Sequence, residues 1–392
     1  MDIQVQKLRE ALEVIGPAVP RKSKLEILKN ILLKDGAVVG LDLDTAVAVA
    51  LPEVTEAALL PYRQLVQLLK TVPGSDTLRV ELNSGTRLTW SQGSATYPAA
   101  NVDDYPLMPQ TEAPEQKVDG DAFMADLLAV ESFCATEESR PVLTGVHLIP
   151  GPPMAVAAGD GFRMAYQELR VALDVAEAVI VPRGAVRVLA HCWKKAAASQ
   201  PQGDSFINLI TSKRPLFVAI DKAGLKVKFR FGDVTILCRL IDGMTPGWID
   251  LIPQVQPKRV TVWAQELDRA VKQVAPFLAD NSIIRLSWTE DGVMQVTAHN
   301  EDVGTGESNV PVTIDAEPGR TALNYRYLAQ YLEGKDRQVT IGITNESSPI
   351  LFRYEHAPVV VIMPMFVQWD NEPTPPAAGH EEKIDQEVDP EE

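Results

Sequence analysis

The apolar and polar positions along the chain follow one order of patterns three times. Each unit begins with a helical pattern, in which apolar residues recur at steps of three and four. These stretches are residues 5–16, 120–133 and 263–277. Alternating strands that end in a polar turn come next, at 37–51, 154–169 and 292–310. A second helical pattern follows at 60–70, 181–193 and 323–334, and further strands close each unit.

Two independent sets of anchor residues test this repeat. The anchors in the strand turns are 118 and 140 residues apart; they are Asp42, Asp160 and Asn300. Those of the second helices are 121 and 142 residues apart; they are Pro61, Pro182 and Asn324. Both sets place extra length late in the second unit. Repeats this long are whole domains. The sequence therefore predicts the α+β class, with three similar domains, each carrying two helices on one face of an antiparallel sheet.

Composition and cysteine usage narrow the class of protein. The 392 residues are 45% hydrophobic and 23% charged, an ordinary globular mixture. No apolar stretch approaches the roughly 20 residues of a membrane helix, and the N-terminus has a helical pattern rather than that of a signal peptide. We therefore expect a cytoplasmic protein without membrane contact. The cysteines (Cys134, Cys192, Cys238) form no C-x-x-C pair and the histidines are scattered, so we expect no metal and no cofactor.

The negative charge is unevenly distributed. The formal net charge is −16, and residues 370–392 hold nine acidic residues and one lysine, so half of it lies in this C-terminal tail. The tail is rich in proline and acids, and we expect it to be disordered. The acidic body argues against a generic nucleic-acid binder, which would be basic. It leaves open a protein whose positive charge is confined to one surface.

Four stretches show a resemblance to a known family. They are ATEESRPVLTGVHL (135–148), AAGDGFRMAY (157–166), FGDVTILCRLIDGMTPGWIDLIP (231–253) and VIMPMFV (361–367). With them, the chain resembles the bacterial sliding clamp, the beta subunit of DNA polymerase III, over residues 1–367. KLEILKNILL and VDDYPLMP in the first unit match more loosely, and GLDLDTAVAVAL departs from the family pattern.

The resemblance implies a fold and a function. The clamp domains would span 1–113, 114–256 and 257–369, followed by the tail at 370–392. Two chains would form a head-to-tail homodimer, a closed ring around double-stranded DNA that it binds without sequence preference. This processivity factor would tether the DNA polymerase III catalytic subunit and other proteins that carry a clamp-binding motif. A separate ATP-driven clamp loader would open the ring, and the clamp itself would not be an enzyme.

The resemblance also implies a pocket between the second and third domains for peptides of the glutamine–leucine–leucine–phenylalanine type. Methionine suits such a pocket because its flexible thioether adapts to different partners. We also expect Gly159 and Gly161 to let the backbone approach the ligand closely. Arg163 should donate hydrogen bonds to the peptide. The implied pocket residues are Leu143, Gly159, Gly161, Phe162, Arg163, Met164, Pro246, Leu251, Val361, Met363, Pro364 and Met365.

Three residues depart from the family at this pocket. Phe162 replaces a usual histidine, Phe366 a basic residue, and Asp250 a residue that is commonly basic or polar. The rim should therefore be more apolar and more acidic than usual, and the tail could lie near it and repel acidic competitors. Taken without its neighbours, Val361–Met365 also reads as an ordinary core strand with a proline at its edge.

The helical patterns carry a net charge of about +4 inside the acidic body, which favours weak, salt-sensitive contacts with phosphates. Each basic residue on its own could equally belong to a solvated helix face. The candidate DNA-binding residues are Lys22, Arg63, Lys70, Arg183, Arg187, Lys194 and Lys195. The resemblance places a dimer interface at Phe277 and Leu278, with Tyr97 facing it, although Phe277 could equally be a core residue.

Two other functions stay open from the sequence. A clamp-fold interaction scaffold would keep the repeats and the pocket without encircling DNA. A magnesium-dependent phosphohydrolase could use Asp42 and Asp44, since LDLDTAV resembles a D-x-D-x-T loop, with Ala46 where that loop has threonine.

Overall fold

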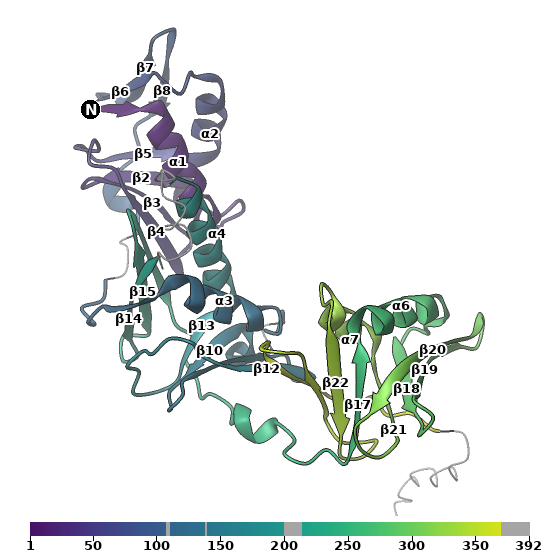
Figure 1. Ribbon diagram of the computed structural model, residues 1–392. Coiled ribbons are helices and arrows are strands. Elements are labelled where there is room, and N and C mark those ends of the chain that lie inside the picture. Colours follow the sequence, from purple (N-terminus) through teal and green to yellow (C-terminus); the bar gives the residue numbers. More distant parts are fainter. Residues whose placement is uncertain (107–109, 138, 200–213, 370–392) are drawn as a thin grey trace, which may run out of the picture.

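The computed structural model describes residues 1–106, 110–137, 139–199 and 214–369. The acidic tail, predicted to be disordered, lies outside these residues. Within them the chain forms a curved row of three similar α+β units, with its helices along the concave side (Figure 1). No helix in the described part of the chain is long and apolar enough to cross a membrane.

Each unit contains the same succession of strands and helices. The first comprises β1 (Asp2–Gln4), α1 (Val5–Ile15), β2 (Asn30–Lys34), β3 (Ala37–Leu41), β4 (Thr45–Ala50), β5 (Ala58–Pro61), α2 (Tyr62–Thr71), β6 (Thr77–Leu82), β7 (Gly85–Trp90) and β8 (Gly93–Pro98). The second comprises β9 (Gln116–Asp119), α3 (Gly120–Glu131), β10 (Gly145–Ile149), β11 (Ala155–Gly159), β12 (Arg163–Glu168), β13 (Val179–Pro182), α4 (Arg183–Ser199), β14 (Pro215–Asp221), β15 (Lys226–Phe231) and β16 (Val234–Arg239). The third comprises β17 (Lys258–Trp263), α6 (Ala264–Val274), β18 (Ile283–Trp288), β19 (Val293–Asn300), β20 (Gly304–Ile314), β21 (Gly319–Asn324), α7 (Tyr325–Leu332), β22 (Gln338–Ile343), β23 (Ile350–Arg353) and β24 (Val359–Ile362).

The sheet topology repeats as strictly as the element order. One set of four strands runs β5-β2-β3-β4, then β13-β10-β11-β12, then β21-β18-β19-β20 in successive units. The other runs β1-β6-β7-β8, then β9-β14-β15-β16, then β17-β22-β23-β24. The predicted threefold repeat is confirmed. The extra length of the second unit follows the start of α4, which has 17 residues where α2 has 10 and α7 has 8.

The three turn anchors share one hydrogen-bond pattern. Asp42 Oδ1 accepts from the backbone N–H groups of Asp44 and Thr45, at 3.2 and 2.7 Å. Asp160 Oδ1 likewise accepts from the backbone N–H groups two and three residues later, at 3.0 Å each. Asn300 Oδ1 accepts from the two equivalent N–H groups at 2.9 and 3.2 Å. A short Asp or Asn side chain is suited to this turn because it can mimic a backbone carbonyl. The anchors therefore mark the same strand reversal in each unit.

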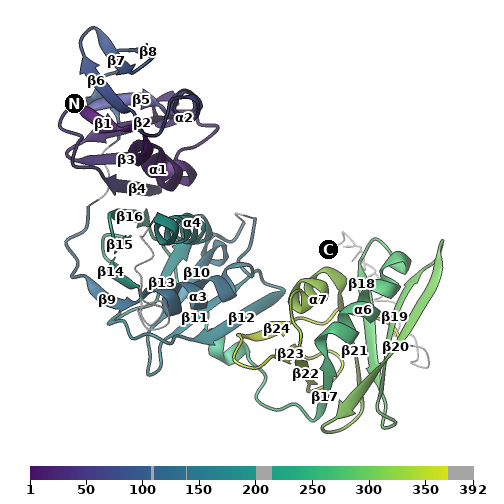
Figure 2. The same ribbon diagram turned by 45° about the horizontal axis from the view of Figure 1, so that its top comes forward.

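Neighbouring units are joined by continuous sheets. β4 pairs with β16, with Ala46 opposite Leu237, and β12 pairs with β24, with Met164 opposite Val361. In Figure 2 the two strands of each pair lie side by side, β4 and β16 at the first junction and β12 and β24 at the second. The same relationship would require a partner for β20 and for β8, the corresponding strands at the two ends of the row. Among the described residues, β8 is the last strand of its sheet. There β20 pairs with β17 over Val312–Ile314, and the rest of β20 pairs with β19 alone.

Helices also join the first two units. His191 Nε2 donates to the carbonyl oxygen of Glu13 at 2.8 Å, and Cys192 Sγ donates to that of Val14 at 3.4 Å. Lys195 pairs with the Glu13 carboxylate at 2.6 Å. At this junction α4 of the second unit therefore packs against α1 of the first unit.

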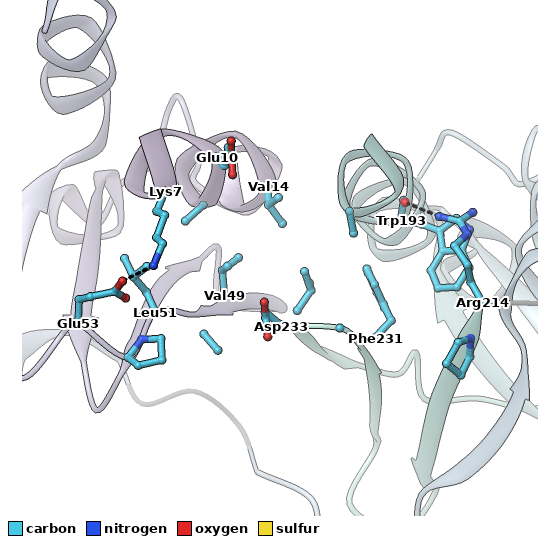
Figure 3. A pocket seen from close by; sticks show the side chains of 17 residues that line it. Lys7, Glu10, Val14, Val49, Leu51, Glu53, Trp193, Arg214, Phe231 and Asp233 are labelled. Carbon is cyan, nitrogen blue, oxygen red and sulfur yellow. Dashed lines mark hydrogen bonds and ion pairs between the residues drawn. The ribbon is translucent and has the colours of Figure 1, made fainter. Parts of the chain in front are cut away.

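A cleft of about 500 Å³ remains beside this helix contact (Figure 3). Val14, Trp193 and Phe231 contribute apolar walls, and the Lys7–Glu53 ion pair lies at one side. None of the predicted site residues lines this cleft. The first junction is thus held by the β4–β16 pair and by the contact between α1 and α4, and the cleft lies beside that contact.

Candidate functional site

The predicted pocket residues from three distant segments meet where β12 joins β24. Leu143, Met164 and Val361 are 8%, 4% and 4% exposed and belong to one buried cluster with Trp248. Ala157, Ile252 and Leu351 complete this cluster. The cluster forms an apolar floor, which is separate from the main core of the molecule.

The rim above this floor exposes large apolar side chains. Phe162 is 62% exposed, Leu251 51% and Met363 45%. Phe162 and Met363 are direct neighbours, since the Met363 N–H donates to the Phe162 carbonyl oxygen at 2.8 Å. Pro246, Pro364 and Met365 are partly buried, and the nearby Met244, Ile249 and Phe366 are exposed. Contiguous exposed apolar surface of this kind marks a site of interaction.

The two glycines of the β11–β12 turn serve the protein's own packing. A Cβ atom at Gly159 would lie 2.8 Å from the Trp248 ring, so only glycine lets the indole pack there. Gly161 has φ of +93°, and a Cβ there would lie 2.9 Å from Arg140 Nη1. In this structure the two glycines therefore admit neighbouring side chains. That they also let the backbone approach a ligand stays a prediction.

Arg163 lies inside the junction between the second and third units. Its side chain is 9% exposed, and its nitrogens donate to Asp160 Oδ2 at 3.1 Å, to Gln330 Oε1 at 2.7 Å and to the Ser132 carbonyl at 3.3 Å. Its guanidinium also lies 4.6 Å from the Tyr327 ring centre. These three hydrogen bonds connect the second unit to α7 and use three of the five N–H donors of the guanidinium. Donation to a bound peptide stays a prediction.

The predicted basic residues differ in pairing and in exposure, and Arg187 is both paired and exposed. Arg183 Nε and Arg187 Nε both donate to Glu131 Oε1 at 2.6 Å, and Lys195 pairs with Glu13. The exposed members are Lys22, Arg63, Lys70, Arg187 and Lys194. The helical ones among them lie on helices of the concave side, and Lys22 lies in the connection between α1 and β2 (Figure 1).

The acidic residues of α3 are neutralised by arginines outside that helix. Asp121 pairs with Arg214, and the fully buried Asp126 pairs with Arg170 at 2.7 Å. Glu131 is held by the two arginines of α4. The formal charge of −3 on α3 therefore overstates the negative field along the concave side.

The predicted dimer residues lie at the two ends of the row of units. Tyr97 is a half-buried residue of β8, and burial raises the pKa of its hydroxyl. Phe277 and Leu278, also half-buried, follow α6, and the Phe277 ring lies so close to Gly306 of β20 that a Cβ atom there would overlap it. β8 and the first part of β20, whose outer edges the repeated pairing leaves open among the described residues, thus carry a predicted interface residue on or beside them.

The geometry does not favour the phosphohydrolase alternative. The carboxylate of Asp42 is committed to the backbone of its own turn, and burial raises its pKa. Among the described residues, no group of three or more His, Cys, Asp or Glu side chains is placed to hold a metal ion.

Comparison with known families decides the relationship. Residues 117–247 match the central domain of the DNA polymerase III beta subunit, and residues 249–366 match its C-terminal domain, together well over half of the chain. The chain belongs to the DNA polymerase III beta subunit family.

Individual relatives extend this match over the whole body. The beta sliding clamp of Synechococcus elongatus is 28% identical over 365 residues, which are 88% of this chain and 92% of that protein. The beta sliding clamp of Staphylococcus aureus is 25% identical over 90% of this chain and 93% of its own. The crystal structure of the beta subunit from Pseudomonas aeruginosa shares the fold, with a TM-score of 0.81 over 94% of this chain and 100% of that one, at 20% identity.

Two aromatic residues of this beta subunit were missed as site residues from the sequence. Trp248 is 4% exposed and packs on Gly159 in the floor of the pocket. Tyr327 of α7 stacks on Arg163 from the third unit. The signal for Trp248 was present, since a tryptophan in a Pro-Gly connector three residues before Leu251 has few reasons to be buried except contact with the pocket. No sequence signal indicated the Tyr327 contact, because 164 positions separate it from Arg163.

A buried histidine beneath the pocket should make this clamp sensitive to acid. His147 Nε2 donates to the Val142 carbonyl at 2.8 Å, Nδ1 lies 3.3 Å from Thr245 Oγ1, and the ring meets Trp248 edge to face. Burial lowers its pKa to about 4, whereas an unfolded histidine has a pKa of about 6.5. Between these values the unfolded chain binds a proton that the folded chain does not, so stability falls as the pH falls from 6.5 towards 4.

We expect His147 to account for up to about 3 kcal/mol of this loss. The free energy of unfolding, measured by urea titration between pH 7 and pH 4, should fall less steeply in His147→Gln than in the unsubstituted protein. His299→Gln, at an exposed histidine of β19, is the matched control and should keep the original slope. Equal slopes in all three proteins would contradict the prediction.

Proposed function

We propose that this chain is a DNA sliding clamp, in which two copies join head to tail and encircle duplex DNA. The observation that carries the proposal is the repeated edge pairing in a member of this family. At each junction within the chain, the last strand of one four-stranded set pairs with the last strand of the next unit's other set. The corresponding strands at the ends are β20 and β8, so β20 of one copy pairs with β8 of the other.

This pairing rule also places helices at the subunit interface. At the first junction, α4 of the second unit packs against α1 of the unit before it. By the same relationship α2 of one copy packs against α6 of its partner. Three clamp domains per chain, 1–113, 114–256 and 257–369, then give a ring of six domains with the helices inside.

The inner surface suits sliding rather than tight binding. The concave side carries exposed basic residues on α2 and α4, while the acids of α3 are neutralised by arginines. A few phosphate contacts give weak, salt-sensitive binding without sequence preference. The grip on DNA therefore comes from encirclement. The clamp has no catalytic role, and it acts in the cytoplasm, where the replication machinery works.

The apolar pocket at the second junction recruits the partners. A Leu or Phe side chain buried on the floor of Leu143, Met164, Trp248 and Val361 contributes about 1.5–3 kcal/mol. Such a short peptide binds reversibly, so the polymerase catalytic subunit, the clamp loader and other motif-bearing proteins can exchange on one clamp. The three departures, Phe162, Asp250 and Phe366, shift its preference towards partners with apolar and basic flanking residues.

Retention on circular against linear DNA tests encirclement directly. The clamp is loaded onto a nicked circular plasmid by its ATP-driven loader and then separated by gel filtration, in enough salt to screen phosphate contacts. We expect the clamp to co-elute with the circle and to be released when a restriction enzyme linearises it, because a ring can slide off free ends. Equal retention on both forms would instead indicate an interaction scaffold that does not encircle DNA.

A further inference from the structure

The chain continues past the pocket as a strap across the outer face of the third unit. The Met365 N–H donates to the Ala322 carbonyl of β21 at 2.7 Å. Arg320, Ala322 and Asn324 are two residues apart in β21, so their side chains share one face of the strand. Ala322 is nevertheless only 1% exposed. The strap, residues Met363–Trp369, therefore meets β21 along the edge that faces away from β18. Beyond that contact, Val367 and Trp369 line a hollow on this face together with Arg285 and Arg320.

The strap ends in a contact between Trp369 and two arginines. The Arg320 guanidinium lies 4.7 Å from the centre of the Trp369 ring, and that of Arg285 lies 5.7 Å from it. Arg285 Nη2 also donates to the Gln368 carbonyl at 3.4 Å. Arg320 is itself held by Glu346, at 2.6 Å. Both arginines lie on strands of the rigid sheet, so the indole is fixed to that sheet by cation–π contacts.

We propose that Trp369 is a positioning residue for the peptide pocket. Met363 and Met365 are tied to the body by one backbone hydrogen bond each, and Pro364 between them has no N–H to donate. Beyond Met365 the strap is held by the Gln368 carbonyl, at a long 3.4 Å from Arg285 Nη2, and by the Trp369 ring, whose two arginine contacts anchor its end. Without this ring, the strap must be ordered each time a peptide binds, and this entropy loss is subtracted from the affinity. The inference rests on the proposed peptide-binding role of this site.

Four variants separate the role of Trp369 from that of the tail. They are Trp369→Ala, Trp369→Phe, a chain that ends at Gln368 and a chain that ends at Trp369. Binding of a fluorescent peptide of the glutamine–leucine–leucine–phenylalanine type is measured by anisotropy at two salt concentrations. We expect Trp369→Ala and the chain ending at Gln368 to lose about threefold to tenfold in affinity. Trp369→Phe, which keeps an aromatic face, and the chain ending at Trp369 should bind like the full chain.

A second measurement reports on the strap without any peptide. In protein with labelled methionine methyl groups, the Met363 and Met365 resonances should move towards disordered values in Trp369→Ala. The resonance of Met124, buried in α3, should not move. Unchanged peptide affinity in Trp369→Ala, or an equal loss in the chain that ends at Trp369, would overturn the inference alone. Absence of peptide binding by the unsubstituted protein would overturn the proposed function and the inference together.

Discussion

Replacing Phe162 and Met363 together by aspartate is expected to weaken binding of a glutamine–leucine–leucine–phenylalanine peptide by roughly 30- to 150-fold. The two residues are adjacent on the rim, and in the free protein Phe162 is 62% and Met363 45% exposed. A bound leucine or phenylalanine loses their apolar contact and meets two carboxylates, a loss of about 2–3 kcal/mol. Fluorescence anisotropy with the labelled peptide measures the change.

The fold should survive this double substitution. Both side chains are exposed to solvent. The hydrogen bond from the Phe162 N–H to Asp160 Oδ1 involves the backbone, so it remains in the aspartate variant. Leu43→Asp is the matched control, since Leu43 lies on the corresponding β3–β4 turn of the first unit and is 49% exposed. We expect it to change the affinity less than twofold. A similar loss in both proteins, or no loss in the double variant, would place the peptide elsewhere.

The sequence predicted the fold well because the repeat is local. Turn anchors such as Asp160 and helix starts such as Pro182 are fixed by short-range backbone chemistry, and each recurs in three copies. The junctions were less accessible, because β4–β16 and β12–β24 pair residues that lie about 200 positions apart in sequence. No alternation of apolar residues in one strand indicates which distant edge it will meet.

The candidate site shows the same division. Apolar residues such as Met164 and Met363 came together as expected, since an apolar floor with an exposed rim needs only burial on one side. The role of Arg163 was less accessible, because a charged side chain in a pocket motif reads equally as a ligand donor or as an internal tie. Only the three-dimensional positions of Gln330 and Tyr327 show that Arg163 forms an internal tie. The same reasoning applies to Arg183, whose partner Glu131 belongs to another helix.

Charging either free edge of the chain should convert the clamp to a monomer. In the variant with both Phe277→Asp and Leu278→Asp, two apolar side chains beside β20 become acidic; in Tyr97→Asp the aromatic residue of β8 does. At about 1.5–3 kcal/mol for each buried apolar side chain, the dimer dissociation constant should rise by roughly 100-fold or more. Light scattering should then give 42.9 kDa, the mass of one chain, in place of about twice that value. Val255→Asp, at an exposed residue away from both edges, should leave the dimer intact.

Mixing the two edge variants distinguishes a ring from any other dimer. A mixed pair has one interface made of two unsubstituted edges and one made of two charged edges, because the contact is head to tail. It should therefore recover the mass of a dimer but stay open, and it should not be retained on circular DNA. A dimer formed through one edge alone would behave differently: only the variant at that edge would become a monomer, and mixing it with the other variant would not restore its dimer mass. Recovery of mass together with retention on circles would show that closure through both edges is not what holds this clamp on DNA.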